Sequence, residues 1–114
     1  MKIRVFFVFI IVAGSILSSC EKSVPKKGIP ACLENKINEF KNIACDKGAA
    51  VKEYTFQGKT VYMLYPGNCG ADMTTAVIDS SCNSLGDLGG ILGNTKINGE
   101  EFSKAIYIRT IWEN

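Results

Sequence analysis

Residues 51–65 read VKEYTFQGKTVYMLY, and this stretch decides the fold. Apolar and polar residues alternate with a period of two around Gln57-Gly58, which is typical of two strands joined by a tight turn. A two-residue loop pairs Tyr54 with Val61, so the stretch predicts a β-hairpin. We expect its apolar face to pack against a preceding helix; this face comprises Tyr54, Phe56, Val61, Met63 and Tyr65.

The residues before the hairpin predict one α-helix from Pro30 to Ile43. Proline suits the first turn of a helix, where its missing N–H is not needed. An apolar stripe recurs at helical spacing along this segment, formed by Leu33, Ile37, Phe40 and Ala44. This stripe is the face that we expect to be buried.

The residues after the hairpin predict the remainder of a small sheet. Thr74 to Asp79 reads as a third strand, and residues 86–93 as a glycine-rich loop or irregular strand. Glu100 to Lys104 predicts a helical turn, and Ala105 to Glu113 a closing strand. The whole pattern predicts one α+β domain over residues 30–114, with an N-terminal helix packed on a small, mostly antiparallel sheet.

The start of the chain has the pattern of an export signal. Lys2 and Arg4 precede an apolar run over residues 5–13, which is too short for a comfortable membrane span. Leu17-Ser18-Ser19-Cys20 then resembles the lipobox of bacterial lipoproteins. The alternative is an ordinary cleaved signal with an incidental cysteine.

The lipobox predicts a signal peptide over residues 1–19 and a lipid on Cys20. Two acyl chains on that cysteine give stable anchoring, whereas a single chain is marginal. Residues 20–29 then form a short polar tether. Glu21 follows the cysteine in place of aspartate, and by resemblance to the usual sorting rule this favours the outer membrane of the cell envelope.

Composition excludes several classes of partner. Cleavage removes Lys2 and Arg4 from the 13 basic residues, so 11 remain opposite 11 acidic ones and the mature chain is neutral. A neutral surface does not indicate nucleic-acid binding. Removing 19 of the 114 residues leaves 95, enough for one domain. A chain this short buries only about 60% of its unfolded surface and benefits from covalent cross-links.

Four cysteines besides Cys20 are candidates for disulfides, and they are Cys32, Cys45, Cys69 and Cys82. An oxidising compartment after export allows them to pair. Four cysteines permit three pairings. We favour the two pairs that close short loops, Cys32–Cys45 and Cys69–Cys82. Zinc binding is the disfavoured alternative, because no CxxC pair and no histidine is present.

The order of several motifs resembles a family of known sequences. Ile29-Pro30-Ala31-Cys32 opens the helix, residues 53–62 read EYTFQGKTVY, residues 77–79 (VID) lead to Cys82, and GGILG (89–93) and TIWE (110–113) follow. With the lipobox, this order resembles a domain-of-unknown-function family of small lipoproteins from Bacteroidetes-type Gram-negative bacteria. The resemblance covers nearly the whole mature chain and implies no activity.

The chain departs from that family pattern at its cysteines. The family often has two adjacent cysteines where this chain has Cys69-Gly70, and a further cysteine near the position of Lys96. Cys45 looks particular to this chain. The resemblance therefore implies no disulfide map.

Residues suited to catalysis, metals or cofactors are few. With no histidine, the Ser-His-Asp and Cys-His arrangements are impossible, and residues 86–93 lack a phosphate-binding motif. Asp79-Ser80-Ser81-Cys82-Asn83 has the oxygen spacing of a calcium loop but lacks its glycine and its final glutamate. We expect no enzyme, no metal site and no cofactor. A carboxylate pair acting on a glycan is the remaining catalytic alternative.

One candidate partner surface combines tyrosines with an exposed backbone. The alternative is that the tyrosines are core or half-exposed residues and that the glycines provide the backbone geometry of a tight loop. Tyr62 and Tyr107 fall on the strand face opposite the predicted core, and Gly89 and Gly90 would expose backbone N–H and C=O groups. The resulting hypothesis is a non-catalytic envelope lipoprotein that binds a protein or glycan partner or supports structure. The alternative is a small inhibitor or immunity-type lipoprotein acting on an exported hydrolase.

Overall fold

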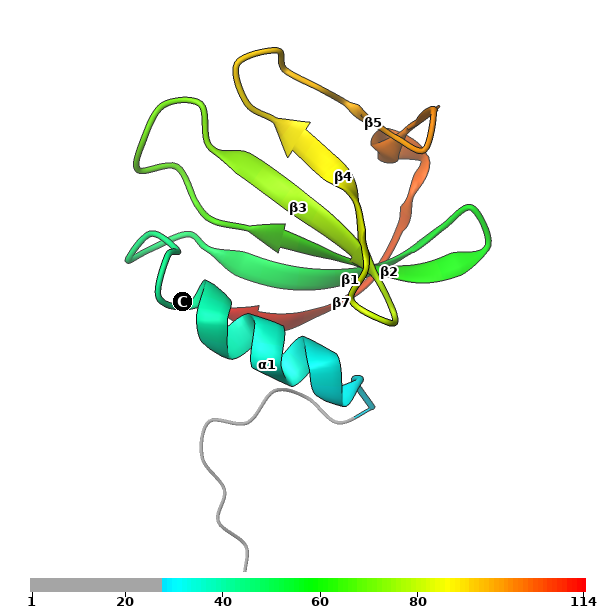
Figure 1. Ribbon diagram of the computed structural model, residues 1–114, viewed down its shortest axis with the longest axis horizontal. Coiled ribbons are helices and arrows are strands. Elements are labelled where there is room, and N and C mark those ends of the chain that lie inside the picture. The colour runs from blue at the N-terminus through cyan, green and yellow to red at the C-terminus, as the bar shows by residue number, and fades with distance from the viewer. Residues whose placement is uncertain (1–27) are drawn as a thin grey trace, which may run out of the picture.

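The structure is a computed structural model that describes residues 28–114. One helix lies against one face of a five-stranded sheet, and a two-stranded sheet lies on the other side (Figure 1). The elements in chain order are α1 (Ala31–Phe40), β1 (Ala50–Phe56), β2 (Lys59–Tyr65), β3 (Thr74–Asp79), β4 (Ser84–Gly89), β5 (Lys96–Ile97), β6 (Glu100–Glu101), the 3-10 helix η1 (Phe102–Lys104) and β7 (Ile106–Glu113).

The five-stranded sheet has the order β4-β3-β2-β1-β7, and its neighbouring strands are antiparallel. The hairpin forms with the predicted register, because Tyr54 lies opposite Val61 and Phe56 opposite Lys59. The glycine-rich segment divides at Gly89, where β4 ends and a turn begins. The helical turn predicted over residues 100–104 is shorter than expected: the first two residues form the strand β6, and the last three form the 3-10 helix η1.

Helix α1 is the first element that the structure describes, but it begins at Ala31 and so is not at the N-terminus of the chain. It ends at Phe40, earlier than predicted, and turns occupy residues 41–43. Leu33, Ile37 and Phe40 are buried, which confirms the predicted stripe apart from Ala44, which is only partly buried.

The sheet face beneath α1 is not the predicted one. The helix packs on Val51, Tyr62 and Leu64, whereas Tyr54 and Phe56 point to the opposite side. Trp112 joins the helix-side core through an edge-on contact with Phe40, with ring centroids 6.0 Å apart. Both strand faces of the hairpin are apolar, so alternation alone did not identify the one that the helix covers.

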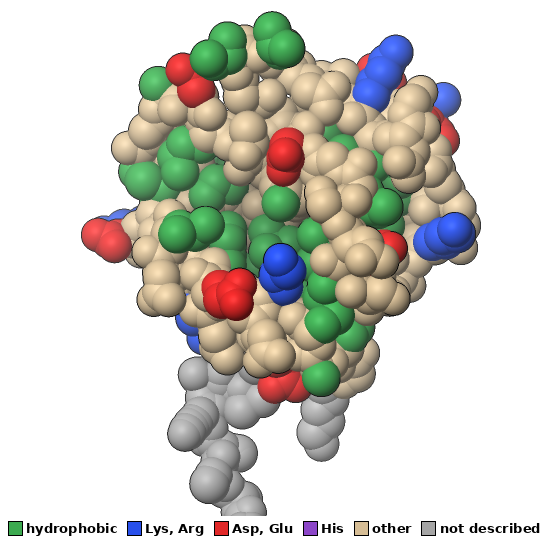
Figure 2. Space-filling view, viewed as in Figure 1, with side chains coloured by type: hydrophobic (Ala, Val, Ile, Leu, Met, Phe, Trp, Pro, Cys, Tyr) green, Lys and Arg blue, Asp and Glu red, His purple; other side chains and the backbone are tan. Residues whose placement is uncertain are grey.

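The opposite face of the sheet has its own core. Phe56, Val61 and Val77 are buried there beneath Ile97 of β5 and Phe102 of η1. The connection from β4 to β5 crosses the top of the molecule, where hydrophobic side chains project (Figure 2). Sequence periodicity did not predict this second layer, because its strands are only two residues long.

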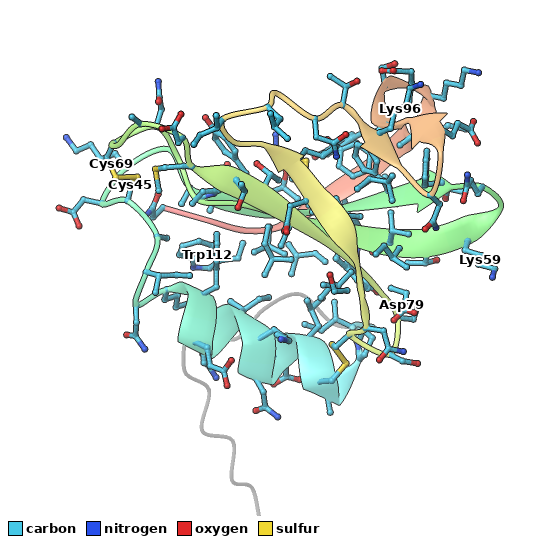
Figure 3. All side chains as sticks on the ribbon, turned by 45° about the horizontal axis from the view of Figure 1, so that its top comes forward. Cys45, Lys59, Cys69, Asp79, Lys96 and Trp112 are labelled. Atoms are coloured by element: carbon cyan, nitrogen blue, oxygen red, sulfur yellow. A yellow bond between two sulfur atoms is a disulfide. The ribbon has the colours of Figure 1, made fainter. Side chains whose placement is uncertain are left out.

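Two disulfides cross-link the domain, but neither is a pair that we predicted. Cys32 pairs with Cys82 and Cys45 with Cys69, with Cα separations of 6.2 and 5.8 Å. Cys32 and Cys45 lie at opposite ends of a ten-residue helix about 15 Å long, so they cannot meet. Cys69 and Cys82 likewise flank the six-residue strand β3, about 20 Å long. The two bonds lie at opposite ends of the domain (Figure 3).

The predicted signal peptide, and Cys20 with the tether up to residue 27, lie outside the described residues. Within residues 28–114, no helix has the length and apolar character needed to span a bilayer.

Candidate functional site

An open groove of about 490 Å³ lies on the sheet face away from α1. It forms because the second layer covers Phe56 and Val61 fully but leaves Tyr54 and Met63 only partly buried. The residues that line it come from β1, β2, β4, β6 and η1, from the connection before β5 and from the link between η1 and β7. They are Tyr54, Met63, Leu88, Asn94, Thr95, Glu101, Phe102, Ser103 and Ala105. Most of the groove surface is therefore apolar.

The floor of the groove is a row of packed aromatic rings. The Tyr54 ring contacts Phe102 edge-on at 5.2 Å and Tyr107 at 5.8 Å, measured between ring centroids. Burial raises the pKa of Tyr54, and the nearby Tyr107 raises it further, so its phenol stays protonated at neutral pH. A neutral, amphipathic ring on a fixed platform suits partner binding.

Tyr107 extends this aromatic row into solvent. It is 52% exposed, and the ammonium of Lys52 lies 5.9 Å from its ring centroid. Its hydroxyl is 2.8 Å from the Thr110 hydroxyl, which fixes the ring orientation. Of the two tyrosines in the candidate partner surface, Tyr107 is therefore the exposed one, beside Tyr54 of the groove.

Tyr62, the other tyrosine of the candidate partner surface, lies on the opposite face of the sheet from Tyr107. It is only 3% exposed and packs in the core beneath α1. Burial raises the pKa of Tyr62, with a further upward contribution from Glu53 and a downward one from Arg109. Tyr62 is therefore a core residue and does not belong to a partner surface.

The polar rim of the groove is occupied by internal hydrogen bonds. The Asn94 amide donates to the carbonyls of Asp87 at 2.7 Å and Lys96 at 2.8 Å, and its oxygen accepts from the Lys96 N–H. The Thr95 hydroxyl donates to Glu101 at 3.0 Å. These bonds hold the connection before β5 against β4 and make the groove wall rigid.

Gly89 and Gly90 lie at a tight turn, as the alternative interpretation of the glycine-rich stretch predicted, and do not offer free backbone N–H groups to a partner. The Gly89 N–H donates to the Asn94 carbonyl at 2.8 Å, and its carbonyl accepts from the Asn94 N–H at 3.2 Å. The Gly90 N–H donates to the Met73 carbonyl at 3.3 Å. These glycines instead support the turn that follows them.

That turn presents two aliphatic side chains that the sequence analysis did not single out. Ile91 is 80% exposed and Leu92 is 93% exposed. The hydrophobic side chains at the top of Figure 2 project from this connection. The sequence signal for them was a pair of large apolar residues inside a glycine-rich turn, where no core is available to bury them.

Asp79, at the candidate calcium loop, has a structural role. One of its carboxylate oxygens, Oδ1, accepts from the N–H groups of Asn83 and Ser81, both at 2.9 Å. The bond from the Asn83 N–H is the main reason that the pKa of Asp79 lies below its ordinary value. Residues 28–114 hold no cluster of three or more metal-ligating side chains.

Comparison with known proteins places the chain beside one family. The model of a family described as a domain of unknown function, DUF6970, matches residues 38–114. The matched region includes the whole five-stranded sheet and every residue that lines the groove, but only the last three residues of α1. No curated protein and no solved structure matches the chain.

Proposed function

This chain belongs to the DUF6970 family of domains of unknown function. We propose that it is an exported lipoprotein, anchored in the outer membrane through lipid on Cys20. The domain over residues 30–114 then acts as a non-catalytic binding module. Its partner contacts the groove opposite α1.

The observation that carries this proposal is the use of the cysteines. The chain has five, and two disulfides consume Cys32, Cys45, Cys69 and Cys82. Disulfides of this kind persist in compartments outside the cytosol. The cysteine left over is Cys20, at the one place where lipidation requires a free thiol. Two independent features, the disulfides and the lipobox, therefore support the same route of export.

The position of the groove suits a module tethered from its N-terminal side. Ile29, next to the first described residue, packs against the core beneath α1. The groove opens on the opposite face of the sheet. A tether that enters beside α1 leaves the groove free to face away from the membrane.

The chemistry of the groove favours contact with apolar parts of another protein. Aromatic rings and aliphatic side chains are enriched where proteins bind one another, and exposed apolar patches mark such sites. The one carboxylate that lines the groove, Glu101, is hydrogen-bonded to Thr95. We therefore propose a protein ligand and no catalysis.

An inhibitor or immunity-type lipoprotein is the second candidate. Ile91 and Leu92 project from a turn bounded by hydrogen-bonded glycines, which is a shape that can enter the cleft of a hydrolase. If the protein is an inhibitor, the exposed turn makes the main contact with the hydrolase, and the groove lies at the margin of the interface.

Substitution of Cys20 by serine tests the anchor. We expect Cys20→Ser to move most of the protein from the membrane fraction to the soluble fraction, because serine cannot carry the thioether-linked lipid. The measurement is fractionation followed by mass spectrometry of the intact N-terminus. Cys45→Ser/Cys69→Ser is the control, and it should stay in the membrane fraction. Unchanged membrane association of Cys20→Ser would refute the anchor.

Photo-crosslinking from the groove tests the binding role. A benzophenone amino acid at Ser103, an exposed position that lines the groove, is expected to give a discrete adduct in whole cells. The same probe at Glu39, exposed on α1, is the matched control and should give none. Mass spectrometry of the adduct identifies the partner, and a hydrolase would favour the inhibitor. Equal adducts at both positions, or none at Ser103, would refute a partner in the groove.

A further inference from the structure

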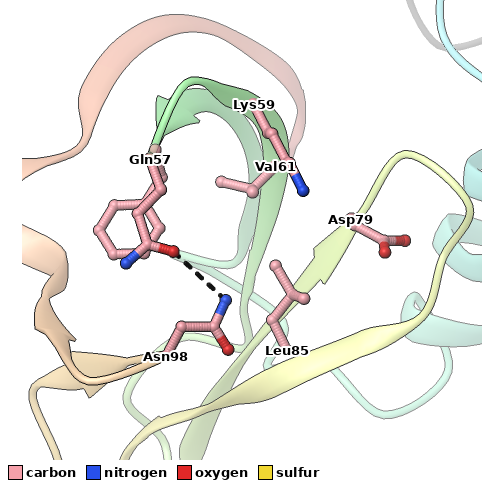
Figure 4. Close-up of a pocket in the computed structure, with 7 residues that line it drawn as sticks. Gln57, Lys59, Val61, Asp79, Leu85 and Asn98 are labelled. Carbon is pink, nitrogen blue, oxygen red and sulfur yellow. Dashed lines mark hydrogen bonds between the residues drawn. The ribbon is translucent and has the colours of Figure 1, made fainter.

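A second, smaller hollow of about 150 Å³ lies where the β1–β2 turn meets the β5–β6 turn (Figure 4). Its floor is apolar and consists of Phe56, Val61 and Leu85. Its rim is polar and consists of Gln57, Lys59, Asp79 and Asn98. This volume is below the roughly 300 Å³ at which drug-sized pockets begin, so any ligand is small.

The two turns that form the pocket are held in a demanding backbone geometry. Gln57 has a φ of 53° and Asn98 a φ of 50°, and each is followed by a glycine of positive φ. Asparagine is common at the first position of such hairpin turns, whereas glutamine is not. Backbone strain of this kind concentrates at functional sites.

The side chain of Gln57 links the two turns. Its amide nitrogen donates to a carboxylate oxygen of Glu100 at 3.0 Å, and its amide oxygen accepts from the Asn98 amide at 3.4 Å. A single side chain therefore fixes the β5–β6 turn relative to the main sheet. The pocket is preorganised before any ligand arrives, which lowers the cost of binding.

Two opposite charges flank the mouth of the pocket without pairing. Asp79 lies opposite Val61 in the sheet, and Lys59 is two residues from Val61 on the same side. Such diagonal neighbours are about 7–8 Å apart. Within residues 28–114 the direct salt bridge is Arg109–Glu53, so Lys59 and Asp79 attract one another without forming a contact ion pair. The Asp79 carboxylate accepts at Oδ1 from the N–H groups of Ser81 and Asn83 and is also hydrogen-bonded by the Asn83 side chain, so a ligand ammonium would share the carboxylate with these donors.

We propose that this pocket binds a small zwitterion, an α-amino acid or a short peptide with both ends free. The ligand ammonium meets Asp79, its carboxylate meets Lys59, and its side chain lies on the floor formed by Phe56, Val61 and Leu85. A simple anion is disfavoured by Asp79, and a simple cation is disfavoured by Lys59. A zwitterion satisfies both charges and the apolar floor. This proposal is independent of the anchor and of the partner groove.

Titration of the isotope-labelled full chain, followed by NMR, tests the proposal. The probes are alanine, leucine and dialanine, which separate a free amino acid from a peptide source. We expect saturable shifts of the backbone amides of Lys59, Asp79 and Asn98. N-acetylalanine lacks the ammonium and alaninamide lacks the carboxylate, and each should bind at least about tenfold more weakly. Absence of shifts with all three probes, or equal binding of either blocked form, overturns the proposal.

Two substitutions separate recognition from folding. Lys59→Met and Asp79→Asn should each weaken binding about tenfold or more, because each removes one charge-assisted contact. Asparagine keeps the oxygen that accepts from Ser81 and Asn83, so the turn is preserved. Lys36→Met and Glu39→Gln make the same charge changes on α1 and should leave affinity unchanged. Equal effects of the pocket and helix variants would overturn the proposal.

Discussion

Removing the Cys32–Cys82 disulfide is expected to lower the free energy of unfolding by about 4 kcal/mol. The bond closes a loop between residues separated by 50 positions, and without it the unfolded chain gains conformational entropy. This is a large fraction of the stability of a small domain. The measurement is equilibrium unfolding in urea of Cys32→Ser/Cys82→Ser, compared with the unsubstituted chain. Replacing both residues avoids a free thiol that could exchange with the other disulfide.

The second disulfide supplies the matched control. Cys45→Ser/Cys69→Ser opens a separation of 24 residues, and the expected loss is smaller, about 3.5 kcal/mol. The order of the two losses is the sharper test, since both variants remove the same kind of bond. A Cys32/Cys82 variant as stable as the parent would contradict the observed pairing. So would intact-mass evidence of a Cys32–Cys45 bridge.

Truncation of Tyr62 is expected to cost about 3 kcal/mol or more, because removing a fully buried aromatic side chain leaves a cavity. Tyr62 is 3% exposed between α1 and the sheet, opposite Ile78. The measurement is again the free energy of unfolding, for Tyr62→Ala. Tyr62→Phe keeps the ring and should lose about 1 kcal/mol or less.

Tyr107→Ala is the control for this prediction. The Tyr107 side chain is 52% exposed, and its main contact is the edge-on one with Tyr54. Losing one such aromatic contact costs about 1 kcal/mol. Similar losses for Tyr62→Ala and Tyr107→Ala would mean that the two tyrosines share one environment, and would contradict their placement on opposite faces.

The strand order near the hairpin could be predicted because turn chemistry fixes register. A two-residue turn at Gln57-Gly58 leaves one pairing of β1 with β2, and the structure has that pairing. The helix could be predicted because Leu33, Ile37 and Phe40 have a spacing that only a helix brings to one side. These features are local, so a short window of sequence contains all the information.

The features that we failed to predict are non-local. The sheet is covered on both faces, so Tyr54 and Tyr62 both belong to apolar sets, and alternation could not assign the helix to either. The cysteine pairing required the length of α1 and β3 as rigid spacers. The two cysteines closest in sequence in each case, Cys32 and Cys45 or Cys69 and Cys82, are held far apart in space by the element between them.

The candidate site was predicted only in part, for the same reason. Tyr107 was named because it falls on the strand face opposite the predicted core. The groove beside it exists only when β5, β6 and η1 fold over the main sheet. The small pocket depends on a side-chain link between Gln57 and Asn98, 41 residues apart. No local pattern contains that contact.

The bond between the start of α1 and the β3–β4 turn has a mechanical consequence. A pull on the chain before Gly28 reaches Cys32 after four residues and then passes through sulfur to Cys82. The force therefore acts on the connection between β3 and β4, and α1 does not unfold progressively from its first residue. Force applied at the start of the described chain thus reaches the sheet through the disulfide before α1 has to unfold.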